Sequence, residues 1–190
     1  MILWLLSLAH AADLPSIQDW TILESQAPSV KCAADGRPWC SSSFQMSCGL
    51  ETLEGLLSDF SMYSETFPRV LSATELEANI VHIRVDMPFP LYPRDYIAHF
   101  RRTETQNGVM FWWTSVVHSK APEREDTVRL PNAAGSWTIE RQSAEQSMVH
   151  YFWNAEIGLD IPDWALPRAR RTQGQEVMFW LQDACNRSKS

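Results

Sequence analysis

The sequence predicts a single α+β domain in which a curved antiparallel sheet wraps around a long C-terminal helix. Many short segments rich in Trp, Phe and Tyr alternate with turn signals, which is typical of antiparallel strands. The apolar spacing becomes helical at about residues 50–60 and again near the end of the chain, at about 162–186. The last helix can bury its apolar stripe only against the concave side of the sheet.

Length and composition limit the class of protein. With 190 residues the chain is long enough for one ordinary domain, and 45% hydrophobic residues with nine Trp exclude a disordered chain. The formal net charge of -7 gives no basic field for phosphate backbones, so we expect no nucleic-acid partner. This charge also argues against standing attachment to an anionic membrane, but it leaves transient membrane contact open. We expect a monomer.

The first twelve residues predict a secretory signal peptide. Met1–Ala12 contains a short apolar run followed by Ala9-His10-Ala11, a small-x-small cleavage pattern, and the composition changes abruptly at Asp13. The alternative is an apolar N-terminal helix that is not cleaved and stays part of the protein. The run is too short to span a bilayer, which requires about 20 apolar residues. We therefore expect a domain over residues 13–190, in the periplasm or secreted.

Four cysteines predict disulfides if the chain is exported, because disulfides persist in oxidising compartments. Cys32 and Cys40 are symmetric about the turn Asp35-Gly36-Arg37, so a hairpin folded there places them opposite one another. Cys48 and Cys185 would form the second pair, for which the even count is the only direct support. Zinc and free core cysteines are the alternatives, although the chain contains no CxxC motif.

The first third of the chain predicts three strands followed by helices. The strands are expected near Trp20–Leu23, Val30–Ala34 and Trp39–Met46, with Asp35-Gly36 as a hairpin signal. Leucines at helical spacing then predict an amphipathic helix from Leu50 to Phe60, and a short helical turn is expected before Pro68.

The remainder predicts a larger set of strands and the last helix. In the second of these strands Val81, Ile83 and Val85 alternate with polar residues, as a sheet with one dry face requires. The last helix is expected from Pro162 to about Asn186, with Pro near its first turn. The predicted strands are Arg69–Ala73, Asn79–Asp86, Arg94–Arg102, Val109–Val117, Trp137–Arg141 and Gln146–Glu156.

Arg94 is the sharpest local signal for a site. It shares one face of its strand with Tyr96 and Phe100, so its guanidinium is expected to point inward. An inward arginine needs a counter-charge or a wet cavity, because burying it unpaired is costly. The alternative is an edge arginine whose side chain extends to solvent.

Three segments carry a resemblance to a known family. Pro88–Tyr96 resembles the proline-rich segment and Arg-Asp pair that begin a central strand in START domains, the steroidogenic acute regulatory protein-related lipid-transfer family of the wider SRPBCC superfamily. Val128-Arg129 followed by Gly135–Ile139 looks like the next paired strands of that family, and Gly158–Trp164 is similar to the segment before its final helix. The resemblance covers about residues 17–186.

The resemblance implies a helix-grip fold with an internal cavity that holds a lipid or sterol-like molecule, without cofactor or catalysis. Its ligand-binding residues would include Arg94, Tyr96 and Phe100. The place where sterol-binding members often carry an acidic partner for this arginine is near Arg69, so two arginines in the cavity would favour an anionic head group. Aromatic residues that could line the cavity, or belong to an ordinary core, are Phe111, Trp113, Tyr151 and Trp153.

Other functions have weaker support in the sequence. The histidines lack a spaced acidic pair, so we expect no metal site. Cyclase or dehydratase chemistry in the same cavity is the alternative function, and His150 with Tyr151 is the candidate acid–base pair. A protein-interaction domain with a filled interior is a third hypothesis. The basic residues Arg168, Arg170 and Arg171 indicate a solvated helix face or a surface that docks on acidic head groups.

Overall fold

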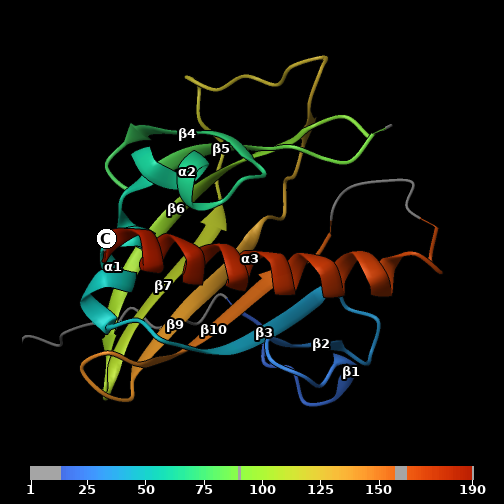
Figure 1. The fold of residues 1–190 in the computed structure, drawn as a ribbon. Helices are drawn as coiled ribbons and strands as arrows, with labels where there is room; N and C mark the ends of the chain where they lie inside the picture. The colour runs from blue at the N-terminus through green and yellow to red at the C-terminus, as the bar shows by residue number, and fades with distance from the viewer. Residues whose placement is uncertain (1–13, 90, 157–161, 190) are drawn as a thin grey trace, which may run out of the picture.

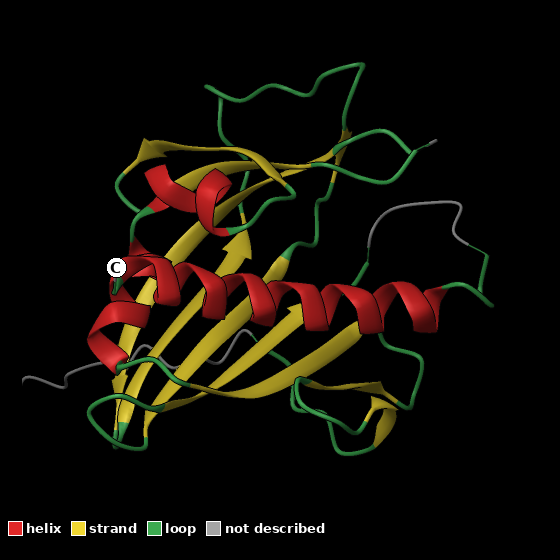
Figure 2. Ribbon diagram, in the orientation of Figure 1, coloured by secondary structure: helices red, strands yellow, loops and turns green. Residues whose placement is uncertain are grey.

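The computed structural model describes residues 14–89, 91–156 and 162–189. One large sheet is crossed on its concave face by the long helix α3 (Figure 1). Two short helices lie near the C-terminal end of α3 (Figure 2). The strands are β1 (Trp20–Glu24), β2 (Ser29–Ala33), β3 (Trp39–Met46), β4 (Val70–Glu77), β5 (Ile80–Val85), β6 (Arg94–Thr105), β7 (Gly108–Ser115), β8 (Val128–Arg129), β9 (Ala134–Arg141) and β10 (Ser147–Asn154). The helices are α1 (Leu50–Ser58), the 3-10 turn η1 (Phe60–Met62), α2 (Tyr63–Thr66) and α3 (Leu166–Ser188).

The sheet has ten strands and confirms the predicted α+β fold class. Nine of the strands run in the order β1-β2-β3-β10-β9-β7-β6-β5-β4, and neighbours in this order are antiparallel. The two-residue strand β8 is the exception, because it pairs in parallel with the start of β6. The expectation that Val128-Arg129 pairs with the following strand was therefore wrong: β9 pairs instead with β7 and β10.

The main hydrophobic core lies between the sheet and the helices. Val81 and Ile83 of β5 are fully buried, as their alternation with polar residues predicts. Leu53 and Leu57 of α1 are buried one turn apart and face the same core. The two periodicities in the sequence therefore identify the faces that pack together.

Both predicted disulfides are present. Cys32 of β2 and Cys40 of β3 lie directly opposite one another in the strand register and are bonded. Cys48 and Cys185 join the segment before α1 to the last turns of α3. Two disulfides among the described residues suit an oxidising compartment, outside the cytosol. The predicted signal peptide, residues 1–12, lies outside the described residues.

The last helix begins four residues later than predicted. Residues 163–165 form a turn, and α3 runs from Leu166 to Ser188 with Pro167 in its first turn. A helix begun at Pro162 would place the ring of Pro167 against the carbonyl group of Asp163, whereas a proline in the first turn costs no hydrogen bond. No helix in the described part of the chain has the length and apolar character needed to cross a membrane.

Gly174 lets α3 approach the sheet closely. A Cβ atom at this position would lie 2.9 Å from the Cη2 atom of Trp153 and 2.9 Å from a methyl group of Val30. Both neighbours are buried, so neither side chain has space into which it can move. At Gly55, in the exposed face of α1, an added Cβ would meet nothing within 4 Å.

Replacing these two glycines by alanine should therefore change stability in opposite directions. Gly55→Ala should raise the free energy of unfolding by about 0.5–1 kcal/mol, because alanine is the better helix former. Gly174→Ala should lower it by about 1–3 kcal/mol, because the new methyl group overpacks the contact with the sheet. Urea unfolding followed by Trp fluorescence measures both changes, and a gain in stability in both variants would contradict this packing.

Candidate ligand-binding cavity

A cavity of about 480 Å³ lies between the sheet and α3. The helix packs on β1, β2 and β3 and on α1 and α2, while the cavity separates it from the middle strands β6, β7 and β9. Pockets that bind small molecules typically have volumes of about 300–1,000 Å³. The interior is therefore not filled with side chains, which argues against the protein-interaction hypothesis.

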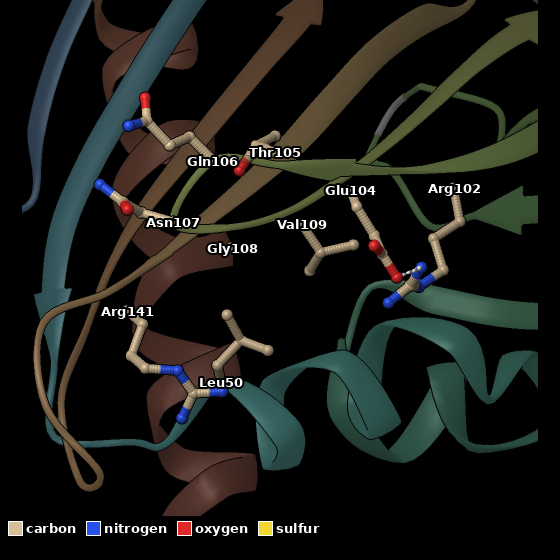
Figure 3. Close-up of a pocket in the computed structure, with 9 residues that line it drawn as sticks. All are labelled: Leu50, Arg102, Glu104, Thr105, Gln106, Asn107, Gly108, Val109 and Arg141. Carbon is tan, nitrogen blue, oxygen red and sulfur yellow. Dashed lines mark hydrogen bonds and ion pairs between the residues drawn. The ribbon is translucent and has the colours of Figure 1, made fainter.

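A second hollow of about 480 Å³ lies outside this interior, at the turn between β6 and β7 (Figure 3). Its two arginines already have acidic partners. Arg102 binds Glu54 at 2.6 Å and Glu104 at 3.4 Å, and Arg141 binds Glu51. Because these ion pairs rim a polar surface hollow, an apolar ligand would gain more by entering the interior cavity.

Arg94 faces the interior cavity, as its position on the strand predicts. It is the first residue of β6 and is only 3% exposed, which excludes the alternative of a side chain extended to solvent. Its guanidinium donates a hydrogen bond to the carbonyl oxygen of Tyr92. Tyr96 and Phe100, on the same face of β6, also line the cavity.

The next residue, Asp95, points to the opposite face and fixes the start of β6. Arg129 of β8 donates two hydrogen bonds to its carboxylate, both at 2.8 Å, and His82 Nε2 lies 2.6 Å away. Burial acts to raise the pKa of Asp95, but the hydrogen bonds from Arg129 and His82 outweigh it and hold this pKa below its usual value. Asp95 is thus a buried carboxylate held by Arg129 and His82.

Arg69 also lines the cavity, but its charge is balanced. Glu176 of α3 accepts two hydrogen bonds from its guanidinium, at 2.9 Å and 3.2 Å. The hydrogen bond to Glu176 raises the pKa of Arg69. Both arginines line the cavity, as expected, but no pattern in the sequence indicated Glu176, which balances the charge of Arg69 and weakens the argument for an anionic head group.

Aromatic rings form a nearly parallel row on the concave face of the sheet. Phe100 stacks on Trp113 at 5.5 Å and 29°, Trp113 on Tyr151 at 6.1 Å and 21°, and Tyr151 on Trp153 at 4.7 Å and 11°. These four residues all line the cavity. We call Phe100, Trp113, Tyr151 and Trp153 the aromatic floor.

Sequence reasoning misplaced one aromatic residue and missed others. Phe111 does not line the cavity but is buried in the main core, two residues before Trp113 on β7. Trp137 lines the cavity and stacks on Tyr151 at 4.3 Å, although it was assigned only to a strand. Tyr63 and Phe67 line it from the α2 segment, and no periodic signal in that short segment identifies them.

The candidate acid–base pair is separated by the sheet. Tyr151 faces the cavity, whereas His150 forms a hydrogen bond of 2.8 Å with the Oγ atom of Ser43 on the neighbouring strand. Adjacent strand residues point to opposite faces, so the two side chains cannot act on one substrate. In the described part of the chain, His, Cys, Asp and Glu do not gather into groups of three that could hold a metal ion.

Sequence comparison shows a partial match to one known protein. No protein-family model matches the chain. An uncharacterized protein of Pseudomonas aeruginosa is 27% identical over 81 residues, which make up 43% of this chain and 40% of that protein. The match thus spans about two fifths of the relative's length.

Solved structures match much more of the chain. Human STARD10 is 20% identical, with 87% of this chain and 72% of that chain covered and a TM-score of 0.77. A STAR-related lipid transfer protein from Xanthomonas axonopodis is 20% identical, with 88% and 98% covered and a TM-score of 0.75. The chain has the START-domain fold. The resemblance of Pro88–Tyr96 to START domains is therefore confirmed at the level of the fold, while Gly158–Ile161 lies outside the described residues.

The START-type fold is also shared by an enzyme. The Zhui aromatase/cyclase from Streptomyces sp. R1128 is 11% identical, with 80% of this chain and 95% of that chain covered and a TM-score of 0.55. At this identity the likeness shows the architecture only.

The basic residues of the START-like last helix do not form one uniform solvated face. Arg168 is exposed and also lines the cavity, and Arg171 is exposed. Arg170 is half-buried, and burial lowers its pKa. Of these three residues, Arg168 and Arg171 are therefore the exposed charges.

The buried Asp95 predicts how stability depends on pH. Because its pKa is lower in the folded chain than in the unfolded chain, its contribution is present above the unfolded value of about 4 and is lost as the pH falls through the folded value. Asp95→Asn should cost about 3–5 kcal/mol at pH 7, since it leaves Arg129 without its buried partner. The stability of the variant should also fall less steeply than wild type below pH 4. Urea unfolding from pH 3 to 7 measures both effects.

The exposed Asp183 provides the control for this measurement. Asp183→Asn should unfold like the wild-type chain at every pH. Parallel pH profiles for the wild-type and Asp95→Asn chains would contradict the role given to Asp95.

Proposed function

We propose that the chain binds one apolar ligand, such as a lipid, in the cavity between the sheet and α3, and carries or stores it without chemical change. The interior cavity with its aromatic floor is the observation that carries this proposal. Transfer of apolar surface from water into such a site is favourable by about 25 cal/mol per Å². A volume of about 480 Å³ suits one small amphiphile better than a large two-chain lipid.

The lining also suggests how such a ligand is oriented. Arg94 lies at the start of β6, whereas Phe100 lies six residues further along the strand. At about 3.3 Å per residue these positions are about 20 Å apart. We therefore place the polar end of the ligand towards Arg94 and its apolar body over the aromatic floor.

The proposal extends to where the protein acts and what it contacts there. The two disulfides support an exported protein, in the periplasm or secreted, and the relatives described as lipid transfer proteins support a lipid-like partner. Exposed Trp164, four residues before the cationic Arg168, would suit transient contact with a membrane surface while a ligand enters or leaves. We propose that the protein acts as a monomer.

The enzymatic alternative has less support. A cyclase or dehydratase needs an acid and a base that reach the same substrate. The one pair nominated from the sequence, His150 and Tyr151, points to opposite faces of the sheet. Binding without catalysis is therefore the function that we propose.

Filling the cavity should weaken binding. Ala169 of α3 lines the cavity, so Ala169→Trp should occupy the ligand's space and weaken binding at least tenfold. Arg171→Trp adds a large ring to an exposed position of the same helix and should leave binding unchanged. The measurement is native mass spectrometry after incubation with a bacterial lipid extract, with titration of the fluorescent fatty acid cis-parinaric acid for affinity.

Thermal unfolding of both variants checks that they fold. Wild type and Arg171→Trp should each retain one ligand per chain. A wild-type protein that stays empty in the lipid extract and does not bind the fatty acid would refute the proposed function, as would full binding by a folded Ala169→Trp protein.

A further inference from the structure

Three tyrosine side chains converge inside the cavity from distant parts of the chain. Tyr63 comes from α2, Tyr96 from β6 and Tyr151 from β10, and all three line the cavity. Their phenol groups are close enough to influence one another's ionisation. We call Tyr63, Tyr96 and Tyr151 the tyrosine cluster.

All three hydroxyl groups of the tyrosine cluster have unused hydrogen-bonding capacity. The Tyr63 hydroxyl donates to the carbonyl oxygen of Leu57 at 2.7 Å and can still accept a bond. For the hydroxyls of Tyr96 and Tyr151, the described residues offer no hydrogen-bond partner, and both rings keep part of their surface free because they face the cavity. A protein rarely leaves such groups unsatisfied in its interior without a ligand, water or functional reason.

A neighbouring polar group shows the same feature. Trp153 also lines the cavity and is 2% exposed, and its ring N–H has no acceptor among the described residues. Its ring stacks directly on Tyr151 at 4.7 Å. Trp153 thus belongs to the same wall of the cavity as Tyr151, but its ring N–H is fully buried.

The tyrosine cluster stays neutral and able to donate hydrogen bonds. Burial raises the pKa of Tyr96 and of Tyr151, and the nearby Tyr96 raises that of Tyr151 further. Ionised phenolates are thus disfavoured at physiological pH, so the cluster would not repel an electron-rich oxygen. A neutral hydroxyl donates to a keto oxygen and both donates to and accepts from another hydroxyl.

We propose that the tyrosine cluster is a specificity subsite that selects a flat apolar ligand carrying a hydroxyl or keto oxygen within its body, away from the end that lies near Arg94. The proposal rests on the proposed function, because it requires a ligand in the cavity. The nearly parallel rings of the aromatic floor offer a stacking surface for a flat ring system. An oxygen on that ring system would satisfy the phenol groups, whereas a pure hydrocarbon would displace their water and leave them unpaired.

The test compares two flat probes that differ only in one oxygen atom. Pyrene and 1-hydroxypyrene are titrated into the protein at pH 7, with quenching of Trp fluorescence as the signal. Wild type should bind 1-hydroxypyrene about tenfold more tightly than pyrene, as expected for one or two neutral hydrogen bonds in a dry site. In the Tyr96→Phe, Tyr151→Phe double variant this preference should fall to about one, while pyrene affinity stays within about twofold.

Two controls separate hydrogen bonding from loss of structure. Tyr92→Phe removes the hydroxyl of a tyrosine that is 65% exposed and should keep the tenfold preference. The double variant should unfold at the same temperature as wild type or higher, because the hydroxyls that it removes make no hydrogen bond to the described residues.

Titration with cis-parinaric acid distinguishes failure of the subsite from failure of the proposed function. If wild type binds this fatty acid but does not prefer 1-hydroxypyrene, or if the double variant keeps the preference, the subsite is refuted and the proposed function stands. If wild type binds neither the fatty acid nor either pyrene, both the proposed function and the subsite are refuted.

Discussion

The close packing of α3 against the edge of the sheet is the constraint on which the rest of the structure depends. Gly174 brings the helix against Val30 and Trp153, and the Cys48–Cys185 disulfide fixes its far end. Because β1, β2 and β3 support the helix on one side and α1 and α2 at its end, it bridges the middle of the curved sheet without collapsing onto it. The cavity is the space beneath that bridge.

Charged groups secure this arrangement from two sides of the sheet. On the outer side Asp95 binds Arg129 and His82, which fixes the start of β6 and therefore the direction of Arg94. On the inner side Arg69 and Glu176 join the start of β4 to α3. Among the described residues the buried charges are Arg94 and Asp95, and both have hydrogen-bonding partners, as the cost of burying an ion requires. The hydroxyl groups of Tyr96 and Tyr151 face the cavity, where a ligand could bind them.

Much of the fold could be predicted from the sequence because its signals are local. Alternation in β5, helical spacing in α1 and the symmetry of Cys32 and Cys40 about a turn each depend on a few neighbouring residues. The errors concern contacts between distant residues: Glu176 with Arg69, β8 with β6, and α2 with the cavity. Alternation identifies the face of the strand on which Phe111 lies, but the depth of each residue along that face depends on the strand register and on α1 and α2.

The indole N–H signals of the tryptophans offer the most direct test that a ligand lies between the sheet and α3. In a ¹⁵N-labelled sample titrated with palmitic acid, the signals of the cavity-lining residues Trp113, Trp137, Trp153 and Trp180 should shift. The signals of Trp20 and Trp39, whose rings contact Phe152 on the other face of the sheet, should stay in place. Shifts confined to the outer tryptophans, or no shifts at saturating ligand, would contradict the account.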